Sequence, residues 1–362
     1  MNKARFILIG LMTAIVILLM GCGANDSKGV SEETDDAADQ GNTVKVGHIS
    51  DEKYFYTANE GGTISKINVK DNKVAATLKA EGIVHNVQIS PDGKIVAATL
   101  VPKPEGGHGD HGGHEIGIPG SVLFYDVHTN KLLKKVEVGK HPAHVVFTND
   151  GKYVLVTNNE DHTATVIEAN SYKVVTTIAT GKGPHGFRIS ADSRLAYIAN
   201  MAEDTVSVIN LDTMKEEKKL KVGETPVTTG ITKDGNTLAV TLFTENALAI
   251  IDIETDERVK VKVGLGPAQV YIDPNDQFAF VANQGTEDVP SNSMSIVDLK
   301  SKRVVDEIET GNGSHGVVIS QDSKFAYVTN MFENTVSIID LTSKEVTTIE
   351  VGEIPNGITI ME

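Results

Sequence analysis

Apolar and polar positions repeat along the chain from about residue 43, in units of four short apolar runs separated by polar turns. One unit reads PHGFRIS, LAYIAN, TVSVINL and KKLKVG, and its runs are rich in β-branched residues. Such runs, bounded by turn residues like Asp192-Ser193, predict strands and not helices. One run recurs seven times, as YFYTAN, IVAATL, YVLVTN, LAYIAN, LAVTLF, FAFVAN and FAYVTN, ending at Asn59, Leu100, Asn158, Asn200, Phe243, Asn283 and Asn330.

The spacing of this run predicts a repeat fold. It recurs every 40 to 47 residues, except for one gap of 58 that contains an insert at 101–120. Four strands in a unit of this length predict an all-β fold, a seven-bladed β-propeller of four-stranded antiparallel blades at 43–362. The chain ends in GEIPNGITIME, another copy of the first strand of a unit. We expect this C-terminal strand to close the first blade and remove two free sheet edges, which leaves the role of residues 43–50 open.

The repeats resemble the YVTN-type propellers of bacterial envelope and surface-layer proteins. The matching pieces are FAYVTN, NTVSIIDL and a G-x-x-P-H-G-x-x-I-S lead-in, and the resemblance covers nearly all of 43–362. It implies the fold and says little about function, because propellers host binding and catalysis alike. Within the motif, the strand-ending asparagines are expected to form turns by bonding their own backbone, as at Asn158, Asn200, Asn283 and Asn330.

The first 42 residues predict export. Lys3 and Arg5 precede an apolar run of about 15 residues, which is typical of a secretory signal and short for a membrane span. The sequence LMGC resembles the lipidation box of bacterial lipoproteins, which implies a signal peptide at 1–21 and a lipid on Cys22; an uncleaved anchor is the alternative. Residues 22–42 are polar and acidic and predict a flexible tether. We therefore expect a cell-envelope protein, lipid-anchored to the extracytoplasmic face of the membrane.

The composition of the chain argues against some classes of partner and limits the side chains that can bind a metal. Lys and Arg number 33 against 49 Asp and Glu, and the net charge of -16 argues against nucleic acids and anionic membrane surfaces as partners. Cys22 is the only cysteine, so a metal site in the mature domain has to use His, Asp, Glu or Met. We expect a monomer that contacts the membrane through the Cys22 lipid only.

The insert contains a candidate metal-binding loop. In GGHGDHGGHEIG, His108, His111 and His114 are three residues apart, with Asp110 and Glu115 beside them. Glycine adds no packing and costs the most entropy to order, so this segment is not expected in a core. Neutral imidazoles bind borderline divalent metals, and carboxylates complete the shell. A soluble loop that is merely rich in histidine is the alternative.

Connectivity brings a second set of histidines to the same face. In an antiparallel blade, the loop before the innermost strand and the loop between strands two and three open on one face. When the innermost strands are aligned on their Ile-Ser ends, His85, His185 and His315 share one position, and His144 lies one place later in the third blade. We predict these four as metal ligands. For each, a structural hydrogen bond to a neighbouring blade is the alternative.

The loop with its flanks, HGDHGGHEIGIPGSVLFYDV, resembles that of the propeller-type zinc metallochaperones of bacterial envelopes. Those proteins pass zinc to the solute-binding protein of a zinc ABC importer. The resemblance implies non-enzymatic zinc binding by loop ligands together with histidines of the channel mouth, the loop ligands being His108, Asp110, His111, His114 and Glu115. The sequence departs from that family in its lipoprotein signal and in Gly112-Gly113, where further polar ligands are expected.

Two other functions are consistent with the sequence. Met201 and Met331 follow the YVTN-like strand in the blades of His185 and His315. Thioethers and imidazoles suit copper, so a copper or haem-type redox propeller is one alternative. A metal-free surface interaction propeller is the other. Because no Ser-His-Asp or Cys-His context, P-loop, dinucleotide fingerprint or CxxCH is recognisable, we expect no enzyme activity outside the redox alternative.

Overall fold

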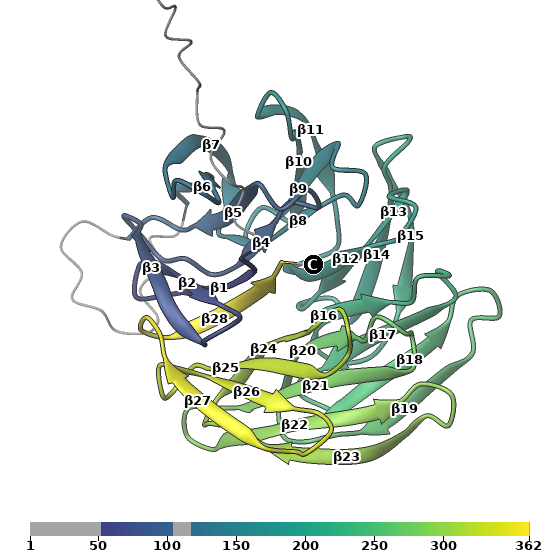
Figure 1. Cartoon of the computed structure of the whole chain (residues 1–362). Coiled ribbons are helices and arrows are strands. Elements are labelled where there is room, and N and C mark those ends of the chain that lie inside the picture. The colour runs from purple at the N-terminus through teal and green to yellow at the C-terminus, as the bar shows by residue number, and fades with distance from the viewer. Residues whose placement is uncertain (1–51, 104–116, 362) are drawn as a thin grey trace, which may run out of the picture. The chain divides into compact units, whose positions relative to one another are not determined.

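The computed structural model describes residues 52–103 and 117–361, and within these ranges its regular structure consists of 28 strands. The strands form seven antiparallel sheets of four strands each, arranged as blades around a central channel (Figure 1). No helix in the described ranges is long and apolar enough to cross a membrane. The predicted all-β, seven-bladed propeller is therefore confirmed.

Each blade orders its four strands from the channel outwards. From the first blade to the seventh, the innermost strands are β28 (Pro355–Ile360), β4 (Val87–Ile89), β8 (Pro142–Phe147), β12 (Pro184–Ile189), β16 (Pro226–Ile231), β20 (Pro267–Ile272) and β24 (Ser314–Ile319). The second strands are β1 (Tyr54–Asn59), β5 (Ile95–Leu100), β9 (Tyr153–Asn158), β13 (Leu195–Asn200), β17 (Thr237–Leu242), β21 (Phe278–Gly285) and β25 (Phe325–Asn330).

The outer half of each blade completes the sheet. The third strands are β2 (Thr63–Asn68), β6 (Pro119–Asp126), β10 (Thr163–Glu168), β14 (Thr205–Asn210), β18 (Ala247–Asp252), β22 (Pro290–Asp298) and β26 (Thr335–Asp340). The outermost strands are β3 (Lys73–Lys79), β7 (Leu132–Lys140), β11 (Lys173–Ala179), β15 (Lys215–Lys221), β19 (Arg258–Lys262), β23 (Arg303–Glu309) and β27 (Val346–Glu350).

The two ends of the described propeller meet in one sheet, which closes the ring. β28 is the innermost strand of the first blade and pairs antiparallel with β1, with Phe55 opposite Ile360 and Asn59 opposite Pro355. The innermost strands also contact one another in succession around the ring, including β24 with β28 and β28 with β4. This arrangement confirms that the C-terminal strand completes the first blade. Residues 1–51, with the predicted signal peptide, tether and Cys22, lie outside the described residues.

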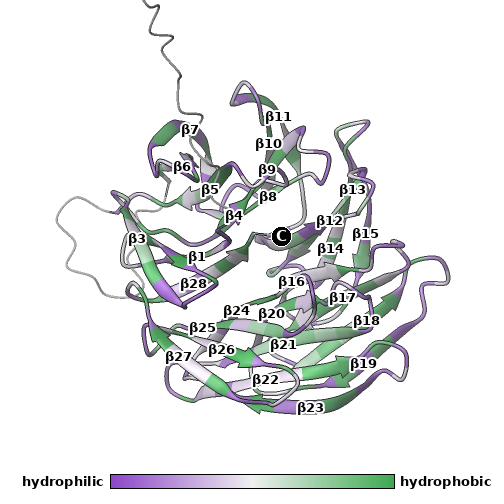
Figure 2. Cartoon of the chain, in the orientation of Figure 1, coloured by the Kyte–Doolittle hydropathy of each residue, from purple (hydrophilic) through white to green (hydrophobic). Residues whose placement is uncertain are grey.

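The hydrophobic core lies between neighbouring blades. The cluster shared by the first two blades includes Tyr56, Val87 and Leu123, which come from three different strands. Because both faces of the inner strands pack against other blades, these strands are almost continuously buried, whereas an outermost strand such as β3 is mostly exposed. Figure 2 shows apolar residues along many of the strands and polar residues at many of the loops.

The asparagines that end the second strands tie two strands of a blade together. Asn330 donates from Nδ2 to Thr335 Oγ1 (2.9 Å) and Ser337 Oγ (3.0 Å), and its Oδ1 accepts from the Gly311 N–H. Equivalent Nδ2 bonds are made by Asn59, Asn158, Asn200 and Asn283. Turns do begin at these residues, as where the carbonyls of Asn200 and Asn330 accept the N–H groups of Glu203 and Glu333. The expectation that the side chains bond their own backbone was wrong, because these fully buried side chains bond to hydroxyl groups of the neighbouring strand.

The fifth blade departs from this arrangement in a consistent way. Its second strand covers Thr237–Leu242, one residue earlier than the predicted run at 238–243, so Leu242 and not Phe243 takes the place of the asparagine. The third strand of that blade carries Ala247 and Ala249 at the positions of the hydroxyl residues. The donor and both acceptors are therefore absent together, and no buried side-chain polar atom in the described strands of this blade is left without a partner.

Candidate metal centre

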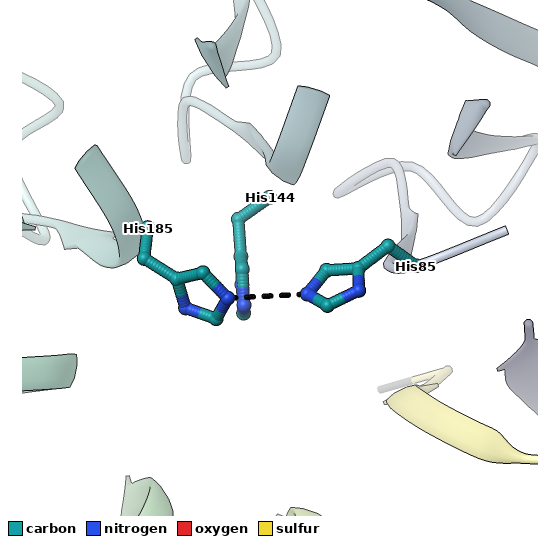
Figure 3. Close-up of side chains that lie close together, drawn as sticks. All are labelled: His85, His144 and His185. Atoms are coloured by element: carbon teal, nitrogen blue, oxygen red, sulfur yellow. Dashed lines mark hydrogen bonds between the residues drawn. The ribbon is translucent and has the colours of Figure 1, made fainter. Parts of the chain in front are cut away.

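Three histidines from three consecutive blades meet at one mouth of the channel. His85 lies two residues before β4, His144 lies on β8 and His185 lies on β12. One ring nitrogen from each lies within 4.8 Å of the others. In Figure 3 the rings of His85 and His185 face each other, and His144 reaches the same point from between them. The fold thus converts a sequence separation of 100 residues into a cluster of side chains.

The distances within this cluster suit a shared ligand. The Nε2 atoms of His85 and His185 are 3.1 Å apart. The ring centroid of His144 lies 4.9 Å from that of His185 and 6.0 Å from that of His85. We call these three residues the three-histidine centre.

His144 joins the cluster from a different strand position than His185. In the alignment of innermost strands, the position of His185 corresponds to Ala143, whose side chain is buried, and His144 occupies the position of Gly186. The pairing of β8 with β9 shifts register between Pro142 and Val145, and that of β12 with β13 shifts between Pro184 and Phe187, so both strands share this irregularity. His144 therefore reaches the centre from one place later than His185.

The outer ring nitrogens fix the inner ones as lone-pair donors. His85 Nδ1 lies 2.8 Å from the Glu60 carboxylate, and His185 Nδ1 lies 3.2 Å from the Val227 carbonyl. Both partners are acceptors, so each Nδ1 carries the hydrogen, and in the neutral imidazole Nε2 then holds a lone pair. The two Nε2 atoms lie at hydrogen-bond distance, 3.1 Å, so one ring donates to the other when it carries a second proton. When both rings are neutral, a cation placed between them would contact both lone pairs.

Burial keeps two of the three imidazoles neutral. Burial is the largest cause that lowers the pKa of His144 and of His185 well below the ordinary value, and the neighbouring histidines lower both further. His144 is 1% exposed, and neither of its ring nitrogens has a hydrogen-bond partner among the described residues. Buried polar atoms are normally paired. An orphaned imidazole beside two others is the arrangement expected of a metal ligand.

Glu60 is a residue of this site that the sequence analysis missed. It directly follows β1 in the first blade and accepts hydrogen bonds from His85 Nδ1 and Asn356 Nδ2, both at 2.8 Å. Burial would raise the pKa of Glu60, but these hydrogen bonds outweigh it and lower the pKa to about 2. A carboxylate that binds the far nitrogen of a metal-ligating histidine orients the ring and raises its basicity. Glu60 occupies the same repeat position as Met201 and Met331, so comparison of that position could have found it.

Two further histidines lie around the centre without belonging to the group of three. His315 is buried, contacts Gln269 Nε2 through Nδ1 at 3.4 Å, and has a pKa lowered to about 4, mainly by burial. His141 pairs with Glu160 at 3.5 Å, and its ring centroid lies 6.4 Å from that of His85. Of the four predicted channel histidines, the structure thus brings together His85, His144 and His185.

The predicted loop ligands lie outside the described residues, namely His108, Asp110, His111, His114 and Glu115. The described chain before this loop pairs with the segment that leads to His85. Val101 exchanges backbone hydrogen bonds with Ile83, which is two residues before His85. The described chain before the insert therefore ends two residues after a backbone pairing with the segment that carries His85.

Comparison with known proteins identifies a family but no characterised sequence relative. The family model described as "Choice-of-anchor I domain" matches residues 64–277, which is more than half of the chain. No curated protein matches the sequence significantly.

Solved structures resemble this one in fold. Hydrazine synthase from Kuenenia stuttgartiensis is 20% identical with a TM-score of 0.66, covering 76% of this chain and 89% of that one. A Bacteroides fragilis protein proposed to be a 6-phosphogluconolactonase is 15% identical with a TM-score of 0.66, covering 86% and 99%. The dihydro-heme d1 dehydrogenase NirN is 13% identical with a TM-score of 0.60, covering 84% and 74%. At these identities the likeness shows a shared propeller fold and assigns no catalysis to this chain.

Proposed function

The chain belongs to the choice-of-anchor I domain family, and for this member we propose zinc binding at the three-histidine centre, in the service of metal delivery. One observation carries the proposal. His85, His144 and His185 converge from three blades, and the buried ring nitrogens of His144 have no partner in the described part of the chain. An apolar or fully hydrogen-bonded residue at position 144 would be less costly to bury, so the imidazole is explained best by a ligand.

The spacing of one pair of ligands agrees with a tetrahedral zinc ion, and the third ligand atom, which lies within 4.8 Å of the other two, has to approach them. With Zn–N bonds of 2.0–2.1 Å, two ligand nitrogens of a tetrahedron are about 3.3 Å apart. The His85 and His185 Nε2 atoms are separated by 3.1 Å, so an ion bound to both needs only a small outward movement of the rings. Neutral imidazoles also suit copper, which is the alternative metal at this site.

Three protein ligands leave one coordination position for exchange. Closed four-ligand sites hold zinc structurally, whereas three-ligand sites keep a position for water or another donor. We propose that the protein is an extracytoplasmic metallochaperone that delivers zinc to the solute-binding protein of an ABC importer, anchored to the membrane through the Cys22 lipid. In this proposal the His108, His111 and His114 imidazoles of the insert, with Asp110 and Glu115, exchange zinc with the channel site.

Zinc titration against a chromophoric chelator tests the channel site. The full chain is purified without a His tag, stripped of metal, and compared with His144→Ala and with His128→Ala, a control at an exposed histidine. We expect about one zinc per chain in the parent and in the control, and at least tenfold weaker binding in His144→Ala. Equal affinity in all three proteins would refute a zinc site at the three-histidine centre. Elemental analysis of the untreated protein decides between zinc and copper.

A second experiment tests the insert separately. His108, His111 and His114 are replaced together by alanine, and the rate of zinc release to excess chelator is measured by stopped flow. We expect slower release and weaker binding with an unchanged thermal unfolding temperature, because the replaced side chains lie in a glycine-rich insert. Unchanged release and affinity would remove the insert from the mechanism and leave the channel site as the metal-binding element.

A further inference from the structure

The central channel contains a cavity of about 540 Å³ that the metal proposal does not use. It extends along β4 from Asn86, next to His85, to Asp92 in the turn after that strand. Its lining is largely polar and includes the side chains of Gln88, Gln269 and Arg188. Cavities of 300–1,000 Å³ with a few convergent polar groups are typical of sites for small molecules.

Arg188 is the unusual residue of this cavity. Its guanidinium donates to the Phe187 carbonyl at 3.0 Å and lies 5.9 Å from the centre of the Tyr271 ring. No carboxylate lies within ion-pair distance of it among the described residues, whereas the exposed Arg194 and Arg258 each pair with an aspartate. A guanidinium has five N–H donors. Most of the donors of Arg188 therefore remain for another acceptor.

The surroundings of Arg188 favour a negatively charged occupant. Gln88 Oε1 accepts the Phe147 N–H at 2.8 Å, so the amide NH₂ of Gln88 is left as a donor at the cavity wall. The acidic residue at the rim, Asp92, accepts from Ser90 and pairs with Lys94 at 3.1 Å, so its charge is compensated locally. Arg188 is partly buried, and an anion that reaches a partly desolvated cation replaces lost hydration.

We propose that the cavity is a second binding site, for a small organic oxyanion whose carboxylate or phosphate group pairs with Arg188. The guanidinium matches either group through two parallel N–H···O bonds. The amide of Gln88 supplies a further donor, and the Tyr271 ring provides an apolar wall. This site does not depend on the metal proposal, because its polar groups are distinct from the ligands of the three-histidine centre.

Calorimetric titration of the metal-stripped full chain tests the site with two probes at constant ionic strength, succinate for a carboxylate and inorganic phosphate for a phosphate. The variants are Arg188→Gln, Arg188→Lys and the control Arg194→Gln, whose arginine is exposed and paired with Asp212. We expect saturable binding of at least one probe to the parent and to the control. Binding should weaken about ten- to a hundredfold in Arg188→Gln, the range for a charged hydrogen-bonded pair.

Arg188→Lys keeps the charge and removes the paired donors, so it carries the comparison if Arg188→Gln does not fold; we expect it to bind at least tenfold more weakly than the parent. Succinate alone, phosphate alone or both would each support the proposal and identify the preferred group. Absence of saturable binding by either probe up to about 10 mM would overturn it. Equal affinity in the parent and both Arg188 variants would overturn it as well, whatever the zinc titrations show.

Discussion

His85 and His185 face each other across the channel mouth with their Nε2 atoms 3.1 Å apart, although the two residues are 100 positions apart in the chain. Each ring is held from behind, His85 by Glu60 and His185 by the Val227 carbonyl. The histidines are therefore arranged before any ligand arrives. Preorganised ligands bind a cation at a lower reorganisation cost than ligands that must first be ordered.

Replacing His144 by leucine should stabilise the metal-free protein while abolishing zinc binding. The substitution removes two buried ring nitrogens that lack partners in the described structure, and relief of such a penalty is worth about 1–2 kcal/mol. Urea unfolding in the presence of a chelator measures the free energy of unfolding. A metal-free His144→Leu protein that is less stable than the parent would indicate that His144 has a structural role.

Replacing Glu60 by glutamine should weaken zinc binding by about tenfold or more without changing the number of sites. The amide no longer accepts a charged hydrogen bond from His85 Nδ1, so the His85 ring loses its orientation and part of its basicity. Glu203→Gln is the matched control, since Glu203 pairs with Lys219 in an exposed part of another blade. Competition titration measures the zinc affinity of both variants, and thermal unfolding checks that each is folded. Equal zinc affinities in the two variants would contradict this role of Glu60.

His315 should make the metal-free protein less stable in acid. Its pKa is about 4 in the folded protein and about 6.5 when unfolded, so the unfolded chain binds the proton first as the pH falls. The free energy of unfolding should therefore decrease by about 2.5 kcal/mol between pH 7 and pH 4.5 on account of this residue. Glu60, whose pKa is about 2, loses its contribution mainly below this window.

The measurement is the difference in unfolding free energy between pH 7 and pH 4.5 for the parent, His315→Gln and the exposed control His128→Gln. His315→Gln should lose less stability on acidification than the other two proteins. His144 and His185 shift stability in the same direction, but they are present in all three and cancel in the comparison. A parallel loss in the three proteins would contradict the assignment to His315.

Asn330→Leu should destabilise the propeller by about 2–3 kcal/mol, because it leaves the hydroxyls of Thr335 and Ser337 and the Gly311 N–H without their partner. The fifth blade shows the compensated combination, with leucine opposite two alanines. Adding Thr335→Ala and Ser337→Ala to Asn330→Leu should therefore recover a large part of the loss. If the triple variant is less stable than the single one in urea unfolding, the asparagine acts by some means other than these bonds.

The repeat pattern was sufficient to predict the blades. The second strand of each blade repeats the same buried run, and the pairing of its neighbours follows from it. β9 and β13 have the bounds that the sequence predicted. The C-terminal strand was predicted for the same reason, as an extra copy of the innermost strand. The one-residue error at β17 arose where Leu242 replaces the asparagine that marks the strand end in five other blades.

The metal centre was predicted less completely, because its members depend on side-chain direction. The alignment grouped His315 with His85 and His185, whereas the structure groups His144 with them, from the strand position that Gly186 holds in β12. An alignment of one position across the blades does not show which side chains of neighbouring blades converge. Glu60 was missed because its partner His85 belongs to another blade, and contacts between blades are not apparent in the repeat of a single blade.

The closure of the ring supports the centre from behind. Asn356 on β28 donates to the Glu60 carboxylate that holds His85. β28 follows the other described strands in the chain and pairs with β1, the first of them, so this support of His85 exists only in a closed ring. Under the proposed function, metal affinity at the three-histidine centre therefore reports on closure of the propeller.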